Sequence, residues 1–308
     1  MTTKVFISTS TFGKFSEEPF KLLRDHGIEY RVNPLGKRLT EGELIGFLTK
    51  DRYSGIIAGT EPLTGKVLNA APTLMVISRV GIGVDNIDLE AAKKHSIKVF
   101  TTLDIVTDAV AELTMGLILC ALRKINLCDR NMRKGLWKKE EGNLFKGKTL
   151  GIIGFGRIGQ RVAELSRNFG VRIIFYDVME KSTEMAEQVS LEYVLENSDV
   201  ITIHIAGKDE VLSADRVFKV KHNAVIINTS RGTAINEDAL YKSLTSGRIS
   251  YAGMDVFRDE PYQGKIKELE NVVLTSHVGS YTVETRVKME VEAVRNLVAG
   301  LGLTEKEN

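Results

Sequence analysis

Three polar residues of complementary chemistry stand in the last third of the chain: Arg231, Glu260 and His277. Histidine titrates nearest neutrality, so His277 could take a proton from a hydroxyl group or return it. A carboxylate such as Glu260 could orient that imidazole and favour its protonated form. The planar guanidinium of Arg231 could pair with a substrate carboxylate and polarise a neighbouring oxo group. Taken singly, each residue also suits a solvated surface. Whether the three have a catalytic role therefore depends on which ligand the chain binds.

A glycine-rich turn supplies that context. Residues 154–159 read GxGxxG, follow the apolar run 150–153, and precede a stretch with helical spacing. Gly154 permits a tight turn, Gly156 lets the backbone approach a pyrophosphate, and Gly159 lets the helix pack on the strand. Asp177 ends the next apolar run, at the spacing where an acid accepts hydrogen bonds from the adenosine ribose. The pattern predicts a dinucleotide site.

Two other interpretations of this turn remain. It could be a tight turn in a protein that binds no nucleotide, or the glycine-rich loop of a methyltransferase. The glycine spacing favours a dinucleotide, and Asp177 favours NAD over NADP because a carboxylate would repel a 2′-phosphate. With NAD, the three polar residues would suit hydride transfer at the hydroxyl-bearing carbon of a 2-hydroxy acid.

The elements that must position these residues alternate between apolar runs and amphipathic stretches, which predicts an α/β fold with two doubly wound parallel sheets. Asp88, and Thr40 with Glu43, mark helix starts, and residues 108–134 read as one long helix. A last helix is expected from Val283 to the glycines at 300 and 302. We expect strands at 5–7, 55–58, 74–77, 149–153, 172–176, 200–205, 224–228 and 250–255.

Composition narrows the possible partners. The 308 residues carry a formal net charge of +2, which gives no basic field for nucleic acid. No apolar run is long enough for a membrane span or a secretory signal. The two cysteines, Cys120 and Cys128, lie too far apart on one helix to bridge, which suits a reducing, cytoplasmic environment. We expect no nucleic-acid, membrane or metal partner.

Over nearly its whole length the sequence resembles the D-isomer-specific 2-hydroxyacid dehydrogenase family. The resemblance rests on residues 79–88 and 110–114, on the glycine turn, and on the segments at 228–232, 253–261 and 274–279. It implies a Rossmann NAD-binding domain at 101–282, inserted into a flavodoxin-like substrate domain formed by 1–100 and 283–308. It also implies a homodimer.

The resemblance assigns roles residue by residue. Arg231, Glu260 and His277 would form the catalytic triad, and the backbone around Arg79, Val80 and Gly81 would hold the substrate carboxylate. The predicted cofactor residues are Gly154, Gly156, Arg157, Ile158, Gly159, Asp177, His204, Thr229, Asp255 and Gly279.

The member that the chain most resembles is phosphoglycerate dehydrogenase, but Glu61 stands where such enzymes often place a basic residue for the substrate phosphate. A glyoxylate/hydroxypyruvate reductase, or another D-2-hydroxyacid dehydrogenase, is therefore the alternative. A corepressor-like NADH-binding protein is a further possibility, but it predicts peptide-binding features or added tails, and neither is evident in the sequence. Formate dehydrogenase ranks low, because the resemblance would require glutamine in place of Glu260.

Overall fold

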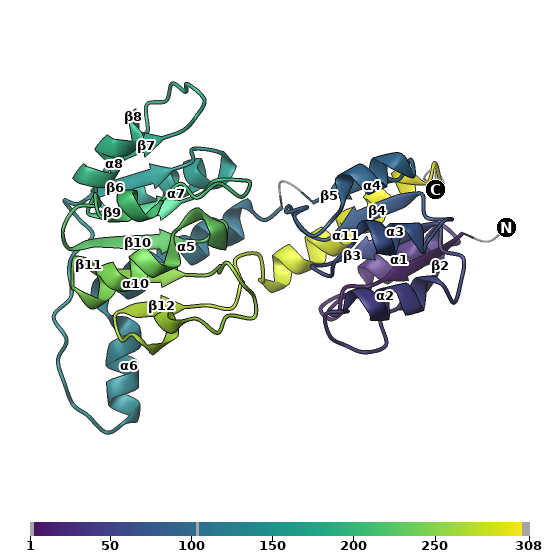
Figure 1. Cartoon of the computed structure of the whole chain (residues 1–308), viewed down its shortest axis with the longest axis horizontal. Helices are drawn as coiled ribbons and strands as arrows, with labels where there is room; N and C mark the ends of the chain where they lie inside the picture. The colour runs from purple at the N-terminus through teal and green to yellow at the C-terminus, as the bar shows by residue number, and fades with distance from the viewer. Residues whose placement is uncertain (1–2, 103–104, 304–308) are drawn as a thin grey trace. The chain divides into compact units, whose positions relative to one another are not determined.

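A computed structural model describes residues 3–102 and 105–303. The chain folds into two compact units, the first made of residues 1–106 and 280–308 and the second of residues 107–279 (Figure 1). The second unit is thus a continuous insertion between the two parts of the first.

Unit 1 is built on a five-stranded sheet in which all neighbouring strands are parallel. The strand order is β2-β1-β3-β4-β5, which is the flavodoxin-like order. Its direction of winding reverses between β1 and β3, and ligands bind at such switch points beyond the carboxyl ends of the strands. The strands are β1 (Lys4–Ile7), β2 (Glu29–Val32), β3 (Gly55–Ala58), β4 (Val76–Arg79) and β5 (Lys98–Thr101).

Helices cover both faces of this sheet. The short helices α2 (Glu41–Leu48), α3 (Gly65–Asn69) and α4 (Leu89–Lys94) share an apolar cluster with Phe6 and Ile56 of the strands. Helix α1 (Glu18–Asp25) packs on α11 (Val283–Gly300), which lies along β3, β4 and β5. The predicted helix starts are confirmed: Thr40 and Glu43 form a capping box, and Asp88 accepts a hydrogen bond from the backbone of Ala91.

Unit 2 contains a seven-stranded parallel sheet in the order β12-β11-β10-β9-β6-β7-β8. From β6 the chain winds out to β7 and β8, and then returns to continue on the other side at β9. This is the Rossmann order, with its switch point between β6 and β9. The strands are β6 (Thr149–Ile153), β7 (Arg172–Tyr176), β8 (Glu187–Gln188), β9 (Val200–Ile203), β10 (Ala224–Asn228), β11 (Ile249–Met254) and β12 (Val272–Leu274).

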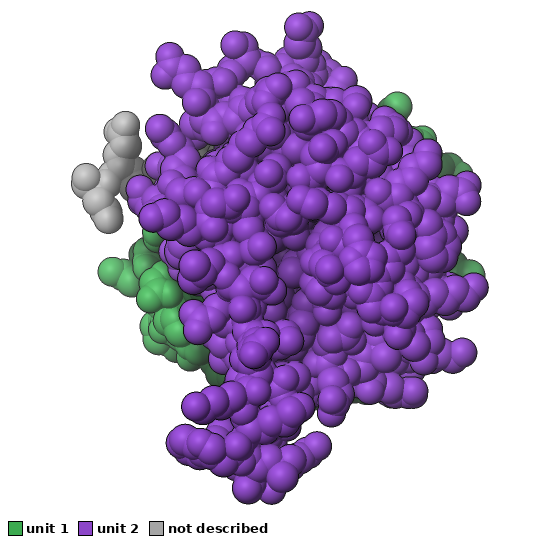
Figure 2. Space-filling model, turned by 90° about the vertical axis from the view of Figure 1, so that its left-hand side faces the viewer, with its two compact units in different colours: residues 1–106, 280–308 green, residues 107–279 purple. Residues whose placement is uncertain are grey.

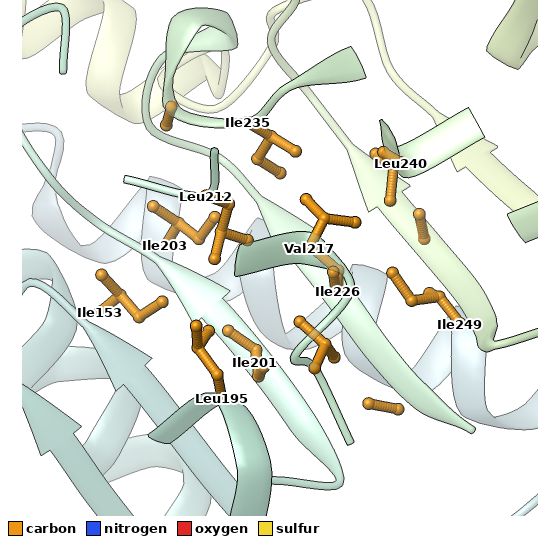
Figure 3. Packing of buried hydrophobic residues seen from close by; sticks show 14 of the residues in the cluster. Ile153, Leu195, Ile201, Ile203, Leu212, Val217, Ile226, Ile235, Leu240 and Ile249 are labelled. Atoms are coloured by element: carbon orange, nitrogen blue, oxygen red, sulfur yellow. The ribbon is translucent and has the colours of Figure 1, made fainter. Parts of the chain in front are cut away.

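Two apolar clusters bury the faces of the unit 2 sheet. One joins the strands to α5 (Thr107–Arg123) and α7 (Arg157–Arg167). The other joins them to α8 (Leu191–Asn197), α9 (Ala214–Val217) and α10 (Glu237–Thr245), and Figure 3 shows its branched aliphatic side chains interlocking. In the space-filling view, residues 107–279 form a continuous, closely packed surface (Figure 2). The predicted α/β class with two doubly wound parallel sheets is confirmed.

The single long helix expected over 108–134 is wrong. The structure has two helices, α5 and α6 (Ile125–Arg133), separated by Lys124 in the left-handed backbone region at φ 51°. The returning chain bonds to the end of α5, where the Asn143 amide donates to the Leu122 carbonyl at 2.8 Å. A long-range contact therefore ends the helix where the local sequence carries no stop signal.

Some features apply to both units. Within the described ranges, no helix is long and apolar enough to cross a membrane. In the same ranges, no group of three or more His, Cys, Asp or Glu side chains is arranged to hold a metal ion. Cys120 and Cys128 are both free thiols.

Candidate active site

The three residues singled out for chemistry follow neighbouring strands of unit 2. Asn228 of β10 pairs with Met254 of β11, which pairs with Leu274 of β12, so the carboxyl ends of these strands lie side by side. Arg231 comes just after β10, and the other two residues follow β11 and β12. The sheet register thus places all three segments at the ligand-binding edge of a Rossmann fold.

His277 and Glu260 are in direct contact. The imidazole Nδ1 lies 2.8 Å from Glu260 Oε2, and the side chains are 50% and 34% exposed. The second carboxylate oxygen, Oε1, accepts from the Phe257 amide at 3.1 Å, which fixes the carboxylate on the loop. Since Nδ1 is bonded to the carboxylate, Nε2 is the ring nitrogen placed to exchange a proton with a substrate. The geometry is that of an oriented general acid/base.

The backbone at His277 is held in an uncommon conformation. Its φ is 55°, in the left-handed region, and its amide donates to the Asp255 carbonyl at 2.8 Å. The buried Asp255 carboxylate accepts from the Thr275 hydroxyl at 2.6 Å and from the amides of Val278 and Gly279 at 2.8 and 2.9 Å. Asp255 therefore shapes the His277 loop, a role additional to the cofactor contact expected from the sequence.

The Arg231 turn is built by Asn228. Its side-chain Nδ2 donates to the Arg231 carbonyl at 2.9 Å, and its Oδ1 accepts from the Ser230 backbone amide at 3.1 Å. Next to it, a Cβ on Gly232 would lie 1.8 Å from the carbonyl carbon of Phe257. Glycine is thus required here, because the turn after β10 packs directly on the backbone of the loop that carries Glu260.

Thr229 connects the same turn to helix α5. Its hydroxyl lies 2.9 Å from the Thr114 hydroxyl, and Thr114 donates to the Val110 carbonyl at 2.8 Å. This contact, which sequence reasoning missed, anchors the end of β10 from the helix side. Thr114 ends the segment 110–114 that carries part of the resemblance, but nothing in the sequence predicts its partner, because a buried threonine in a helix ordinarily bonds only its own backbone.

Each glycine of the turn can be explained either by packing within the protein or by a ligand that approaches the backbone closely. A Cβ on Gly154 would lie 2.6 Å from the His204 carbonyl oxygen, and one on Gly159 would lie 2.2 Å from the Gly154 carbonyl oxygen. Both glycines are thus explained by internal packing. A Cβ on Gly156 would meet no atom within 4 Å. Internal packing does not require that glycine, but the close approach of a pyrophosphate does.

Helix α7 follows the glycine turn, and no side chain caps its N-terminus. The helix begins at Arg157, and its N-cap residue Gly156 has no side chain that could bond the first amides. Amides at a helix N-terminus carry partial positive charge and bind phosphate oxygens. Gly156 and the first residues of α7 are therefore accessible at the switch point between β6 and β9, whereas Gly154 and Gly159 are buried and shape the turn from within.

Asp177 lies just after β7 and reaches back to the glycine turn. Its Oδ2 accepts from the Phe155 amide at 2.7 Å and from Lys181 Nζ at 2.9 Å, and its Oδ1 accepts from the Met179 amide at 3.0 Å. Burial acts to raise the pKa of this carboxyl, but the donated hydrogen bonds and the Lys181 charge outweigh it and hold the pKa below its usual value. Asp177 is therefore ionised at neutral pH.

His204 is an uncharged residue at the same switch point. Its Nε2 lies 2.9 Å from the Thr202 hydroxyl, and its amide donates to the Ile153 carbonyl at 2.7 Å. Burial lowers the pKa of the imidazole to about 3, so the ring is neutral at physiological pH. Its role is consequently one of shape and hydrogen bonding, distinct from that of His277.

In unit 1, the segment expected to hold the substrate carboxylate uses its first amides internally. The Val80 amide donates to the Ala58 carbonyl at 2.8 Å, and the Gly81 amide donates to the Thr102 hydroxyl at 2.9 Å. This differs from the expectation that these two N–H groups bind the substrate. The next amides, those of Ile82 and Gly83, donate to no described residue.

Arg79 folds back over this segment, since its Nη1 donates to the Val80 carbonyl at 2.6 Å. Gly81, at φ 138°, leaves room for that guanidinium, because a Cβ there would lie 1.3 Å from Arg79 Nη1. Arg79 and the two amides that follow Gly81 thus belong to one segment at the carboxyl end of β4.

Glu61 is a buried carboxylate at the switch point of unit 1, where it is 2% exposed. Its Oε1 accepts from the Gly59 amide at 2.8 Å and from the Ser8 hydroxyl. Ser8 follows β1 and Gly59 follows β3, so the two donors come from the strands that flank the switch point. A site for an anionic phosphate would not be expected around this carboxylate.

Comparison with known proteins gives the family. The model for the D-isomer specific 2-hydroxyacid dehydrogenase NAD binding domain matches residues 115–279. A hydroxypyruvate reductase of Thermotoga maritima is 37% identical over 258 residues, covering 80% of this chain and 84% of that protein. A glyoxylate reductase of Thermococcus litoralis is 40% identical over 258 residues, covering 78% of each.

A crystal structure of a protein from Thermus thermophilus superposes with a TM-score of 0.90 at 33% identity, covering 99% of both chains. The chain belongs to the D-isomer-specific 2-hydroxyacid dehydrogenases. This dehydrogenase is an NAD-dependent oxidoreductase, as the glycine turn and Asp177 predicted. The two similar reductases act on glyoxylate or hydroxypyruvate by name, so the comparisons favour the alternative substrate assignment over phosphoglycerate dehydrogenase.

Bound NAD would place its pyrophosphate against Gly156 and the start of α7 and its adenosine ribose near Asp177, and the nicotinamide at the other end of the cofactor would accept or supply the hydride. The residues that position this site in the dehydrogenase but were missed from sequence are Asn228, Thr114 and Lys181. A signal for Lys181 was present in the sequence, namely a cation four positions after Asp177.

Proposed function

We propose that the enzyme reduces small, unphosphorylated 2-oxo acids, with glyoxylate and hydroxypyruvate as its substrates, to the corresponding 2-hydroxy acids. The observation that carries this proposal is the 2.8 Å contact between His277 and Glu260 at the carboxyl edge of the Rossmann sheet. A histidine held by a carboxylate through Nδ1 presents Nε2 as the proton donor or acceptor.

The roles of the catalytic residues follow from this geometry. In reduction, the protonated imidazole of His277 donates its Nε2 proton to the substrate oxo oxygen while hydride arrives at C2. Glu260 stabilises the imidazolium through the Nδ1 hydrogen bond, and the proton moves in the opposite direction during oxidation. Arg231 pairs with the substrate carboxylate and polarises the oxo group. We also assign Arg79 and the amides of residues 82 and 83 to carboxylate recognition.

Glu61 supports the choice of an unphosphorylated substrate. Its carboxylate is held by two donors at the switch point of unit 1, beside the Val80 segment whose amide bonds to β3. A carboxylate at this place opposes a second anionic group on the substrate, since like charges interact more strongly near a buried group than they do in water. Hydroxypyruvate, with a hydroxyl group at its far end, carries no such group.

A substrate panel tests the proposal. NADH consumption would be followed by absorbance with glyoxylate, hydroxypyruvate, pyruvate and 3-phosphohydroxypyruvate. We expect kcat/KM for glyoxylate or hydroxypyruvate to exceed that for 3-phosphohydroxypyruvate by at least about tenfold. A preference for the phosphorylated acid would refute the substrate assignment. Tight NADH binding without turnover of any acid would instead support a corepressor-like protein.

We further propose that the enzyme is a homodimer in the cytoplasm. Helix α6 and the loop after it extend from unit 2 (Figure 1) and expose Trp137 and Leu144 by 83% and 71% of their surfaces. Exposed aromatic and aliphatic side chains on a projecting arm are typical of a subunit interface. Light scattering should give twice the chain mass of 34.2 kDa. The Trp137→Ser variant should shift the equilibrium between monomer and dimer toward the monomer. A wild-type protein with the mass of one chain would exclude the dimer.

A further inference from the structure

The carboxylate expected to hold the adenosine ribose is largely occupied within the protein. Asp177 Oδ2 accepts from the Phe155 amide and from Lys181, and Oδ1 accepts from the Met179 amide. A carboxylate offers about four acceptor positions, so only about one remains for a ribose hydroxyl. The side chain is 11% exposed. Asp177 therefore cannot hold both ribose hydroxyls without releasing one of its internal partners.

Lys181 is the partner that can move. Its Nζ lies 2.9 Å from Asp177 Oδ2 and 2.7 Å from the Phe155 carbonyl, so the ammonium is centred over the glycine turn. An ammonium has three donors, and two are engaged here. The amides of Phe155 and Met179 are fixed by the backbone, whereas a lysine head group swings on a flexible four-carbon stem.

The backbone of Lys181 is nevertheless held in place. Its backbone amide donates to Gln188 Oε1 at 2.7 Å, and the side-chain Nε2 of Gln188 donates to the Met179 carbonyl at 3.0 Å. Gln188 lies in β8, the edge strand next to β7. The loop is thus tied to the sheet at Lys181, and the 27% exposed side chain keeps its charge close to the ribose position.

We propose that Lys181 determines cofactor selectivity, and that it allows the enzyme to bind NADPH as well as NADH. A carboxylate at the end of the second strand discriminates against NADPH because it repels the 2′-phosphate. Lys181 offsets that charge at 2.9 Å, and a rotation of its side chain brings Nζ to the phosphate while Asp177 keeps its two backbone donors. A charge-assisted bond from Lys to phosphate then replaces the ion pair.

Binding titrations test this proposal without substrate, so their outcome is independent of the reduced acid. The dissociation constants of NADH and NADPH would be measured by nucleotide fluorescence for the wild type, K181M and K181R. The matched control is K219M, which removes an exposed cation from the amino-terminal edge of the same sheet, before β10. Thermal unfolding of each variant checks that it folds.

The wild-type ratio of Kd for NADPH to Kd for NADH should be below about a hundredfold, and K181M should raise that ratio by at least about tenfold. K181R should remain within about threefold of the wild type because it keeps the charge, and K219M should leave the ratio unchanged. A wild-type ratio above about a hundredfold, or a smaller rise in K181M, would overturn the proposal. If K181M fails to fold, K181Q takes its place, with the same rise of at least about tenfold expected and a smaller rise overturning the proposal.

Discussion

Replacing Glu260 by glutamine is the sharpest perturbation of the catalytic pair. Glu260 uses both oxygens, with Oε2 bonded to His277 Nδ1 at 2.8 Å and Oε1 accepting from the Phe257 amide at 3.1 Å. A glutamine side chain has one acceptor oxygen and one NH2 donor group, so the variant cannot accept from both the Nδ1–H of an imidazolium and the Phe257 amide, and it loses the negative charge in either case. A hydrogen bond to a charged group contributes about 1.5–3 kcal/mol.

If the imidazolium of His277 loses this hydrogen bond in the transition state, kcat for reduction should fall by about 10- to 100-fold. The assay is steady-state NADH consumption across pH, with NADH affinity measured separately. The control variant is Glu268→Gln, which makes the same change at an exposed position in the 3-10 helix η2 (Lys265–Glu268). A Glu260→Gln enzyme within about twofold of the wild type at every pH would refute the pairing.

Three further predictions test other parts of the structure. Glu61→Gln should raise kcat/KM for 3-phosphohydroxypyruvate relative to hydroxypyruvate by at least about tenfold, since it removes a buried negative charge; an unchanged ratio would contradict the role of Glu61. Asp255→Asn should lower kcat by about 10- to 100-fold and lower Tm, because an amide nitrogen would face a backbone donor of the His277 loop; wild-type kcat and Tm would show that the carboxylate does not shape the loop. His204 has its pKa lowered from 6.5 to about 3, so its contribution to stability is complete above pH 6.5 and is lost as pH falls toward 3. Denaturant unfolding of His204→Asn should therefore depend less on pH in that window than unfolding of the wild type, and parallel curves would contradict the burial argument.

The catalytic and nucleotide segments could be read from sequence because they combine specific residue types with the ends of apolar strands. The glycine turn, Asp177 and the strands β6, β7 and β10 are local features, and the structure has them at the predicted positions. The contact between His277 and Glu260 also followed, because the strands before them are neighbours in the sheet.

The rest depends on contacts that are distant in sequence. The break at Lys124 arises from a hydrogen bond made by the returning chain, and no glycine or proline marks it. Likewise, the amides of Val80 and Gly81 are occupied by a neighbouring strand and by Thr102, which a motif cannot show. The edge strands β2 and β5 are half-polar and lack the continuous apolar pattern of the buried strands.

Substitution of His277 tests the central claim most directly. Because the backbone there has φ 55°, asparagine is a better replacement than alanine, since it tolerates the left-handed conformation and cannot transfer the proton. The measurement is kcat for NADH-dependent reduction of glyoxylate and hydroxypyruvate, together with the Kd for NADH. We predict that His277→Asn lowers kcat by about 10²- to 10⁴-fold while Kd changes by less than about threefold. A His277→Asn enzyme that keeps wild-type kcat would contradict the assignment of this histidine as the general acid/base.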